Sequence, residues 1–172
     1  MIPAAAADSL VEDAAPAAPP PSRMALVALS LVGIFIAAYL TLHRFGFIGT
    51  LICTVTGGCE TVQASAYAFF PPRTVVPWGI SVALIGLIGY LVLFGIGLLG
   101  LQPRYVRSRS IAGLLALLSG GAFAFSLWLT YVEAAILRAW CQWCIVSAIL
   151  IGLIFLLSLV GLRRGPGDTP AT

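Results

Sequence analysis

The sequence of 172 residues has few charged side chains and contains no lysine. Only 9% of its residues are charged, whereas a soluble domain has about 25%. With 60% of its residues hydrophobic, the chain lacks the polar side chains needed to cover a folded surface. The sequence therefore predicts a protein embedded in a lipid bilayer.

Basic residues are also too few and too scattered for a nucleic-acid surface. The formal net charge is +3, and the nine arginines form no cluster interleaved with aromatic side chains. Nucleic-acid-binding domains concentrate positive charge on one face or along one helix. We therefore expect membrane lipid, and no nucleic acid, among the partners of this chain.

Four long apolar runs are each able to cross a bilayer, which takes about 20 helical residues. The first run, residues 24–42, contains no charged side chain. Because His43 and Arg44 follow it instead of a small-residue cleavage site, it favours a retained helix over a signal peptide. In the second run, Gly86 and Gly89 predict a close approach to another helix. The second, third and fourth runs cover residues 78–101, 111–131 and 141–162.

The predicted fold is all-α and integral to the membrane, a bundle of four transmembrane helices over residues 23–162. Residues 1–22 are rich in alanine and proline and lack apolar periodicity, which indicates a disordered tail. Residues 163–172 are expected to form a second, short tail. Four spans return the chain to its starting side, so both tails lie on one side of the membrane. The connection over residues 43–77 then lies on the other side.

Arginines flank the spans unequally, and cytoplasmic loops carry the excess of positive charge in membrane proteins. The side that holds both termini has six of them, Arg23, Arg104, Arg107, Arg109, Arg163 and Arg164. The other side has three, Arg44, Arg73 and Arg138. We therefore expect both termini in the cytoplasm and all four cysteines on the extracytoplasmic face of the cell (inner) membrane, where disulfides form and persist.

Two cysteines at the start of the fourth run, Cys141 and Cys144, are three positions apart. On a helix this spacing puts both on one face, within the separation that a disulfide spans. A helix N-terminus also favours a thiolate. The pair predicts a dithiol that opens and closes where a membrane helix meets water. The alternatives are half of a zinc site, although structural zinc sites use two closely spaced pairs, and two unpaired apolar cysteines.

The connection between the first two spans carries a second pair, Cys53 and Cys59. Gly57 and Gly58 permit a tight turn directly before Cys59. A disulfide across so short a loop adds less stability than one across a long loop, which favours a role in thiol exchange. A plain structural bridge is the alternative.

Two cysteine pairs on one face of the membrane suggest a relay of thiol–disulfide exchange. The loop pair is open to a soluble protein, and the helix pair borders the hydrocarbon core. Electrons would pass from a soluble dithiol through the loop pair to the helix pair, and then to a lipid-soluble acceptor. A quinone has the chemistry that suits this last step.

The loop and the helix pair together resemble the vitamin K epoxide reductase family, and its bacterial members in particular. The resemblance covers about residues 24–162. Its motif residues are Cys53, Gly57-Gly58-Cys59-Glu60, Val62, Ser65, Tyr67, Pro77-Trp78-Gly79 and Cys141-Gln142-Trp143-Cys144. The resemblance implies a four-helix bundle around a quinone pocket, capped by the cysteine-bearing loop.

The same resemblance implies a role for each site residue. Cys141 and Cys144 would form the active-site disulfide, with Cys144 facing the quinone and Cys141 exchanging with Cys59. Cys53 would complete the shuttle disulfide with Cys59. Ser65 matches a serine or threonine that the family places near the quinone carbonyl. No metal ion is implied.

Bacterial members of the family reoxidise a thioredoxin-like protein outside the cytosol and reduce a quinone, which supports disulfide formation. We expect a quinone of the ubiquinone or menaquinone type, and a thioredoxin-like partner that acts in trans. Ala148 stands where vertebrate members have a tyrosine four residues after the second active-site cysteine. In the second span, Ser81 is the best polar candidate for a quinone anchor.

Two other functions fit the same residues. One is the reduction of a vitamin K epoxide, which runs the same cysteines in the opposite electronic sense. The other is a non-catalytic membrane scaffold in which two disulfides merely staple loops.

Overall fold

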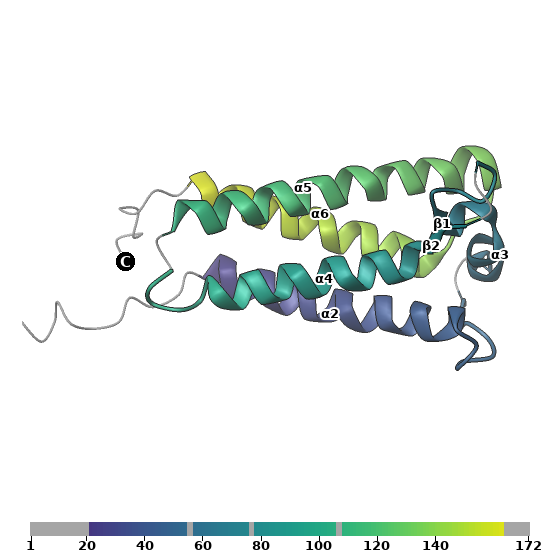
Figure 1. Ribbon diagram of the computed structural model, residues 1–172, viewed down its shortest axis with the longest axis horizontal. Helices are drawn as coiled ribbons and strands as arrows, with labels where there is room; N and C mark the ends of the chain where they lie inside the picture. Colours follow the sequence, from purple (N-terminus) through teal and green to yellow (C-terminus); the bar gives the residue numbers. More distant parts are fainter. Residues whose placement is uncertain (1–20, 55–56, 76–77, 106–107, 164–172) are drawn as a thin grey trace, which may run out of the picture.

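Four long helices run side by side and form an all-α bundle (Figure 1). The computed structural model describes residues 21–54, 57–75, 78–105 and 108–163. Each long helix is apolar enough to cross a membrane, which confirms the expected four-helix membrane fold. The helices are α2 (Pro21–Arg44), α4 (Val82–Leu99), α5 (Arg109–Tyr131) and α6 (Gln142–Arg163).

The bundle is held together by α2 packing against α4 and α6, and by α5 packing against α6. Close approach of α2 and α4 depends on Gly33, where an added Cβ would collide with the ring of Tyr90. Phe123 of α5 and Phe155 of α6 stack with their centroids 5.9 Å apart. Large apolar side chains on the outer faces remain exposed, as expected for helices that face lipid.

The glycines of the second span are not sites of close helix packing, contrary to the expectation from the sequence. Nothing lies within 4 Å of a Cβ added at Gly86 or Gly89, so neither residue mediates close helix contact and that prediction is wrong. Both residues instead line a cavity inside the bundle. The absence of their side chains therefore contributes open volume rather than close packing.

Short elements gather over one end of the bundle and form a cap (Figure 1). Most of them come from the connection between the first two spans, and Ser65 of that connection links its helix to its 3₁₀ turn. The two strands pair antiparallel, with Phe69 opposite Ser81. The elements are α3 (Cys59–Ala64), η1 (Ala66–Ala68), β1 (Phe69–Phe70) and β2 (Ile80–Ser81).

The predicted connection after the third span is partly helical. A π-helix, η2 (Val132–Leu137), continues α5 and is capped by Arg138, which has a left-handed φ of 50°. The amide of Ala139 donates to the carbonyl of Glu133 at 3.3 Å and closes this wide turn. Single π turns are frequent at functional sites, because they change which side chains face inward.

The first residue of α2 and the last residue of α6 lie at the end of the bundle opposite the cap (Figure 1). Most of the tails predicted over residues 1–22 and 163–172 lies outside the described residues. Only residues 21, 22 and 163 are described, and they belong to α2 and α6. The placement of both ends on one side agrees with four spans.

Candidate functional site

Both cysteine pairs lie at the capped end of the bundle. Cys53 and Cys59 form a disulfide with their Cα atoms 6.1 Å apart, as the family resemblance implied. Cys59 and Cys141 are each 0% exposed and belong to one apolar cluster with Leu51. Cys53 is only half-buried, so access from solvent to the loop pair is through Cys53 and not through Cys59.

Gly58 allows the loop to approach the helix pair this closely. A Cβ added at Gly58 would lie 2.7 Å from the carbonyl oxygen of Trp140 and 2.9 Å from its amide nitrogen. Gly58 directly precedes Cys59, and Trp140 directly precedes Cys141. The contact between the two backbones therefore sets the distance between the two buried cysteines.

The two residues between the helix cysteines hold the other side of the loop. The indole Nε1 of Trp143 donates to the carbonyl of Ile52 at 2.9 Å, and the Gln142 amide Nε2 donates to the same oxygen at 3.2 Å. The amide of Ile52 in turn donates to the hydroxyl of Tyr39 at 3.0 Å. Tyr39 and Trp143 also meet edge to face, with centroids 5.3 Å apart. These groups fix the residue directly before Cys53.

Cys141 and Cys144 are both free thiols in the structure. Cys141 lies directly before α6, and its carbonyl accepts the first helical hydrogen bond from Ile145 at 3.0 Å. A hydrogen bond from the Cys144 side chain lowers the pKa of the Cys141 thiol below its ordinary value, although burial and the nearby charge of Glu133 act in the other direction. Among the two helix cysteines, the one in the apolar cluster with Cys59 thus has a thiol that ionises more readily than an ordinary cysteine.

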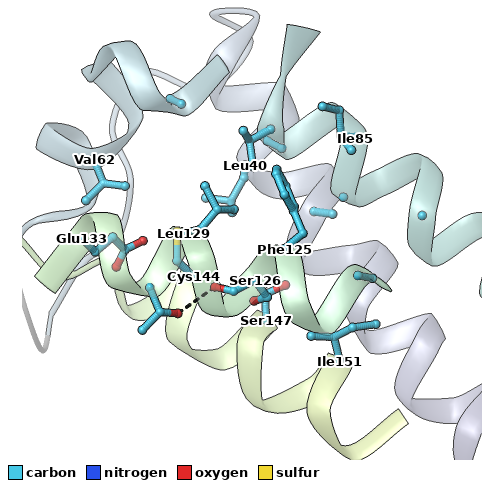
Figure 2. A pocket seen from close by; sticks show the side chains of 18 of the residues that line it. Leu40, Val62, Ile85, Phe125, Ser126, Leu129, Glu133, Cys144, Ser147 and Ile151 are labelled. Atoms are coloured by element: carbon cyan, nitrogen blue, oxygen red, sulfur yellow. Dashed lines mark hydrogen bonds between the residues drawn. The ribbon is translucent and has the colours of Figure 1, made fainter. Parts of the chain in front are cut away.

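A cavity of about 350 Å³ lies inside the bundle beside Cys144 (Figure 2). Its volume is in the range of small-molecule sites, and its walls come from α2, α4, α5 and α6. Cys144 is on the lining, whereas Cys141 is not. The apolar walls include Ile36, Leu40, Ile85, Phe125, Leu129 and Ile151.

Glu133 brings a carboxylate to the same cavity. It is only 4% exposed, and Figure 2 shows it on the lining together with Cys144. Its Oε2 accepts from the Cys141 amide at 3.1 Å, and its side chain hydrogen-bonds to the Cys144 thiol. A single acidic residue at the end of an apolar run is commonly an interface residue, and only the π turn shows that Glu133 reaches both cysteines.

The two serines predicted as quinone contacts occupy different positions. Ser65 lines the cavity, but its hydroxyl donates to the carbonyl of Val62 at 2.7 Å. It must rotate before it donates to a ligand. Ser81 lies outside the lining, directly before Val82, which is on it. The Ser81 hydroxyl is buried, and among the described residues it has no hydrogen-bond partner.

Several further polar groups on the cavity lining were not predicted from the sequence. The hydroxyl of Tyr90 hydrogen-bonds to both the carbonyl and the hydroxyl of Ser147, at 3.0 and 2.9 Å. Ser126 and Thr130 of α5 are also on the lining. Polar side chains inside a membrane-spanning helix often indicate function. Their positions within the apolar runs could therefore have identified these residues from the sequence.

A sequence model of the vitamin K epoxide reductase family matches residues 24–159 of the chain. The chain belongs to this family. Its members are membrane oxidoreductases that act on disulfides and quinones, and this chain is accordingly an oxidoreductase of the membrane. The match includes both cysteine pairs, the cap, α4 and α5, and most of α2 and of α6.

The structure bears on the alternatives for this vitamin K epoxide reductase homologue. A scaffold stapled by two disulfides would join Cys141 to Cys144, but both are thiols here. A zinc site built from all four cysteines is incompatible with the bond between Cys53 and Cys59. Within the described ranges, no group of three His, Cys, Asp or Glu side chains is arranged so that it could hold a metal ion. The arrangement is therefore that of one oxidised and one reduced cysteine pair side by side.

Proposed function

We propose that the protein transfers electrons from extracytoplasmic thioredoxin-like dithiols to a membrane quinone and so supports disulfide formation. In this proposal the loop pair receives the electrons first and the helix pair passes them to the quinone. Cys53 meets the soluble partner, and Cys59 exchanges with Cys141. Cys144 then delivers the electrons into the cavity.

The observation that carries this proposal is the different position of the two helix cysteines. Cys141 is buried in the same apolar cluster as Cys59, while Cys144 lines the apolar cavity. Exchange between the pairs proceeds through a mixed disulfide, which requires a thiolate and a disulfide in contact. The lowered pKa of Cys141 supports its role as the sulfur that exchanges with the loop.

The cavity suits a quinone head group as the substrate that accepts the electrons. A quinone ring needs apolar walls and a hydrogen-bond donor near each carbonyl oxygen. Phe125 and Leu129 supply apolar wall, and the hydroxyls of Ser65 and Ser126 are among the polar groups on the lining. A donor near a carbonyl oxygen would stabilise the negative charge that develops on reduction.

The redox forms of the two pairs correspond to one state of the proposed relay. With Cys53 and Cys59 oxidised and the helix pair reduced, internal exchange is complete and the electrons are on Cys141 and Cys144. From this state, formation of the Cys141–Cys144 disulfide releases two electrons to the quinone. Attack of a reduced Cys59 on Cys141 would then start the next cycle.

The side of the membrane is also part of the proposal. The excess of arginines at the end opposite the cap supports cytoplasmic termini and extracytoplasmic cysteines. A thioredoxin-like partner would then reach Cys53 from the periplasmic or extracellular side.

Replacement of Cys144 by serine tests the proposal. In purified protein, quinone-dependent oxidation of a thioredoxin-like dithiol should be lost, while exchange between Cys59 and Cys141 should remain. Activity retained at the wild-type level in C144S would show that the assignment is wrong. Supplying vitamin K epoxide in place of quinone would separate the two enzymatic functions.

A further inference from the structure

Glu133 is a buried acid in contact with both helix cysteines, and the relay described above assigns it no role. Its Oε2 is 3.1 Å from the Cys141 amide, and its carboxylate hydrogen-bonds to the Cys144 thiol. Among the described residues, the hydrogen-bond partners of this carboxylate are Cys141 and Cys144, and neither is a cation. Its neighbour Arg138 is exposed.

Burying a carboxylate without a cationic partner is costly, and acids inside membrane proteins are usually functional. The protein reduces this cost in two ways. The Cys141 amide donates to the carboxylate, and the start of α6 presents the positive end of its helix dipole to the same point. These two contacts lower the cost of a negative charge beside Cys144 and leave a proton acceptor next to its thiol.

The local backbone is shaped to place this acid. Glu133 lies in the π-helix η2, and its carbonyl accepts from Ala139 to close the turn. The residues that follow it, at positions 134–136, are exposed, while Val132 and Glu133 are buried. The wide turn thus directs Glu133 toward the cavity and the cysteines at a point where the helix otherwise faces outward.

We infer that Glu133 is a catalytic residue that accepts the Cys144 proton and returns it to the reduced quinone. This inference rests on the proposed function. When the Cys144 S–H bond breaks, the proton moves to the Glu133 carboxylate. The sulfurs of Cys141 and Cys144 form their S–S bond and give up two electrons to the quinone.

Two protons must accompany these two electrons to the quinone oxygens. One is the proton held on Glu133, which returns the side chain to its carboxylate form. The other comes from solvent and replaces the proton that Cys141 released when it became a thiolate. One disulfide forms and one quinone becomes a quinol. Glu133 is unchanged at the end of the cycle.

The competing interpretation is that Glu133 only caps the start of α6 through the Cys141 amide. Replacement by glutamine separates the two, because the side-chain oxygen of glutamine still accepts from that amide but has no carboxylate to protonate. Two half-reactions are measured on the purified full chain in nanodiscs. One is reduction of a short-chain ubiquinone analogue by the pre-reduced protein. The other is exchange between the loop pair and the helix pair.

We expect E133Q to slow quinone reduction by about 10²- to 10⁴-fold, the usual contribution of general acid–base catalysis. Formation of the mixed disulfide by attack of Cys141 on the loop disulfide should change by less than about threefold, because this part of the exchange leaves the Cys144 proton in place. E133D keeps a carboxylate and should recover part of the lost rate. The matched control is E60Q, which removes an exposed carboxylate beside Cys59 and should leave both half-reactions unchanged.

Quinone reduction at the wild-type rate in E133Q would overturn the inference. Equal loss of both half-reactions in E133Q and E133D would assign Glu133 to structure alone and overturn it as well. If E133Q fails to fold, E133D decides between the roles by its two rates. Failure of the proposed function looks different, because the wild-type protein itself would then leave the quinone unreduced.

Discussion

Replacing Gly58 by alanine should separate the loop cysteine from the helix cysteine without touching either sulfur. The added Cβ would lie 2.7 Å from the Trp140 carbonyl oxygen, whereas ordinary contact begins at about 3.4 Å. The backbones must therefore move apart by about 0.7 Å, the difference between these two distances. Because each backbone continues directly into Cys59 or Cys141, this movement is transmitted to the reacting pair.

The expected magnitude follows in two ways. A misplacement of about 1 Å at a reacting centre can cost about 10²-fold in rate, so a shift of this size should cost about 10- to 100-fold. Overpacking by one methyl group costs about 1–3 kcal/mol, which corresponds to about 5- to 150-fold at 1.36 kcal/mol per factor of ten. Both routes predict a loss of about one to two powers of ten in exchange rate.

The assay uses the fact that the chain has four cysteines. In a C53A/C144A background only Cys59 and Cys141 remain, and the rate at which a fixed concentration of an added thiol oxidant converts them to a disulfide measures their approach. G58A in this background should slow the cross-link by about 10- to 100-fold. The matched control is G49A, because Gly49 lies in the same connection with nothing within 4 Å of an added Cβ.

An unchanged cross-linking rate in G58A would refute the argument that this backbone contact sets the distance. With all four cysteines present, G58A should still reduce quinone at the normal rate when its helix pair is reduced chemically, because that step does not involve the loop. Loss of this rate would show that the substitution damages the bundle as a whole.

Three further predictions concern the cavity, the loop contact and the thiolate. Gly89→Leu should fill part of the cavity and lower the efficiency of quinone reduction by at least about tenfold, measured by quinone titration, while the Cys59–Cys141 cross-link is unaffected. Trp143→Phe should remove one hydrogen bond to the loop, worth about 0.5–1.5 kcal/mol, and a loss of amide protection in the loop by hydrogen exchange would reveal it. The Cys144 hydrogen bond lowers the pKa of Cys141. C144S keeps a hydrogen-bond donor and C144A does not, so the Cys141 thiolate should persist to lower pH in C144S. The cross-linking rate of each variant, measured against pH, would show this difference, and coincident profiles would contradict the role of that donor.

The sequence predicted the bundle because its signals are local. Long apolar runs have few structures available in a bilayer, where every backbone group must be satisfied within the segment. The four expected spans are the four long helices, with ends that differ by a few residues. The disulfide between Cys53 and Cys59 followed from the family resemblance, since spacing alone left a choice of roles.

The errors arose where packing between helices decides the outcome. A glycine such as Gly86 or Gly89 allows a neighbouring helix to approach closely, but it equally leaves room for a cavity, because it has no side chain. The sequence therefore does not distinguish the two arrangements. A tryptophan at the position of Trp143 could serve only as an anchor at the membrane interface, yet its indole also donates to Ile52 in the loop. An aromatic residue near a helix end suits either role, and only the position of the loop selects between them.

The sequence by itself determined that the chain spans a membrane, that its cysteines form two pairs at one end, and that it resembles a redox family. Composition and spacing carry this information because apolar length and Cys-x-x-Cys geometry act within one segment. The tertiary structure decided which cysteine meets which. Cys59 and Cys141 are brought together across 82 positions by the contact at Gly58, and Glu133 reaches them through a π turn. Such contacts depend on how distant segments pack, and no local pattern encodes them.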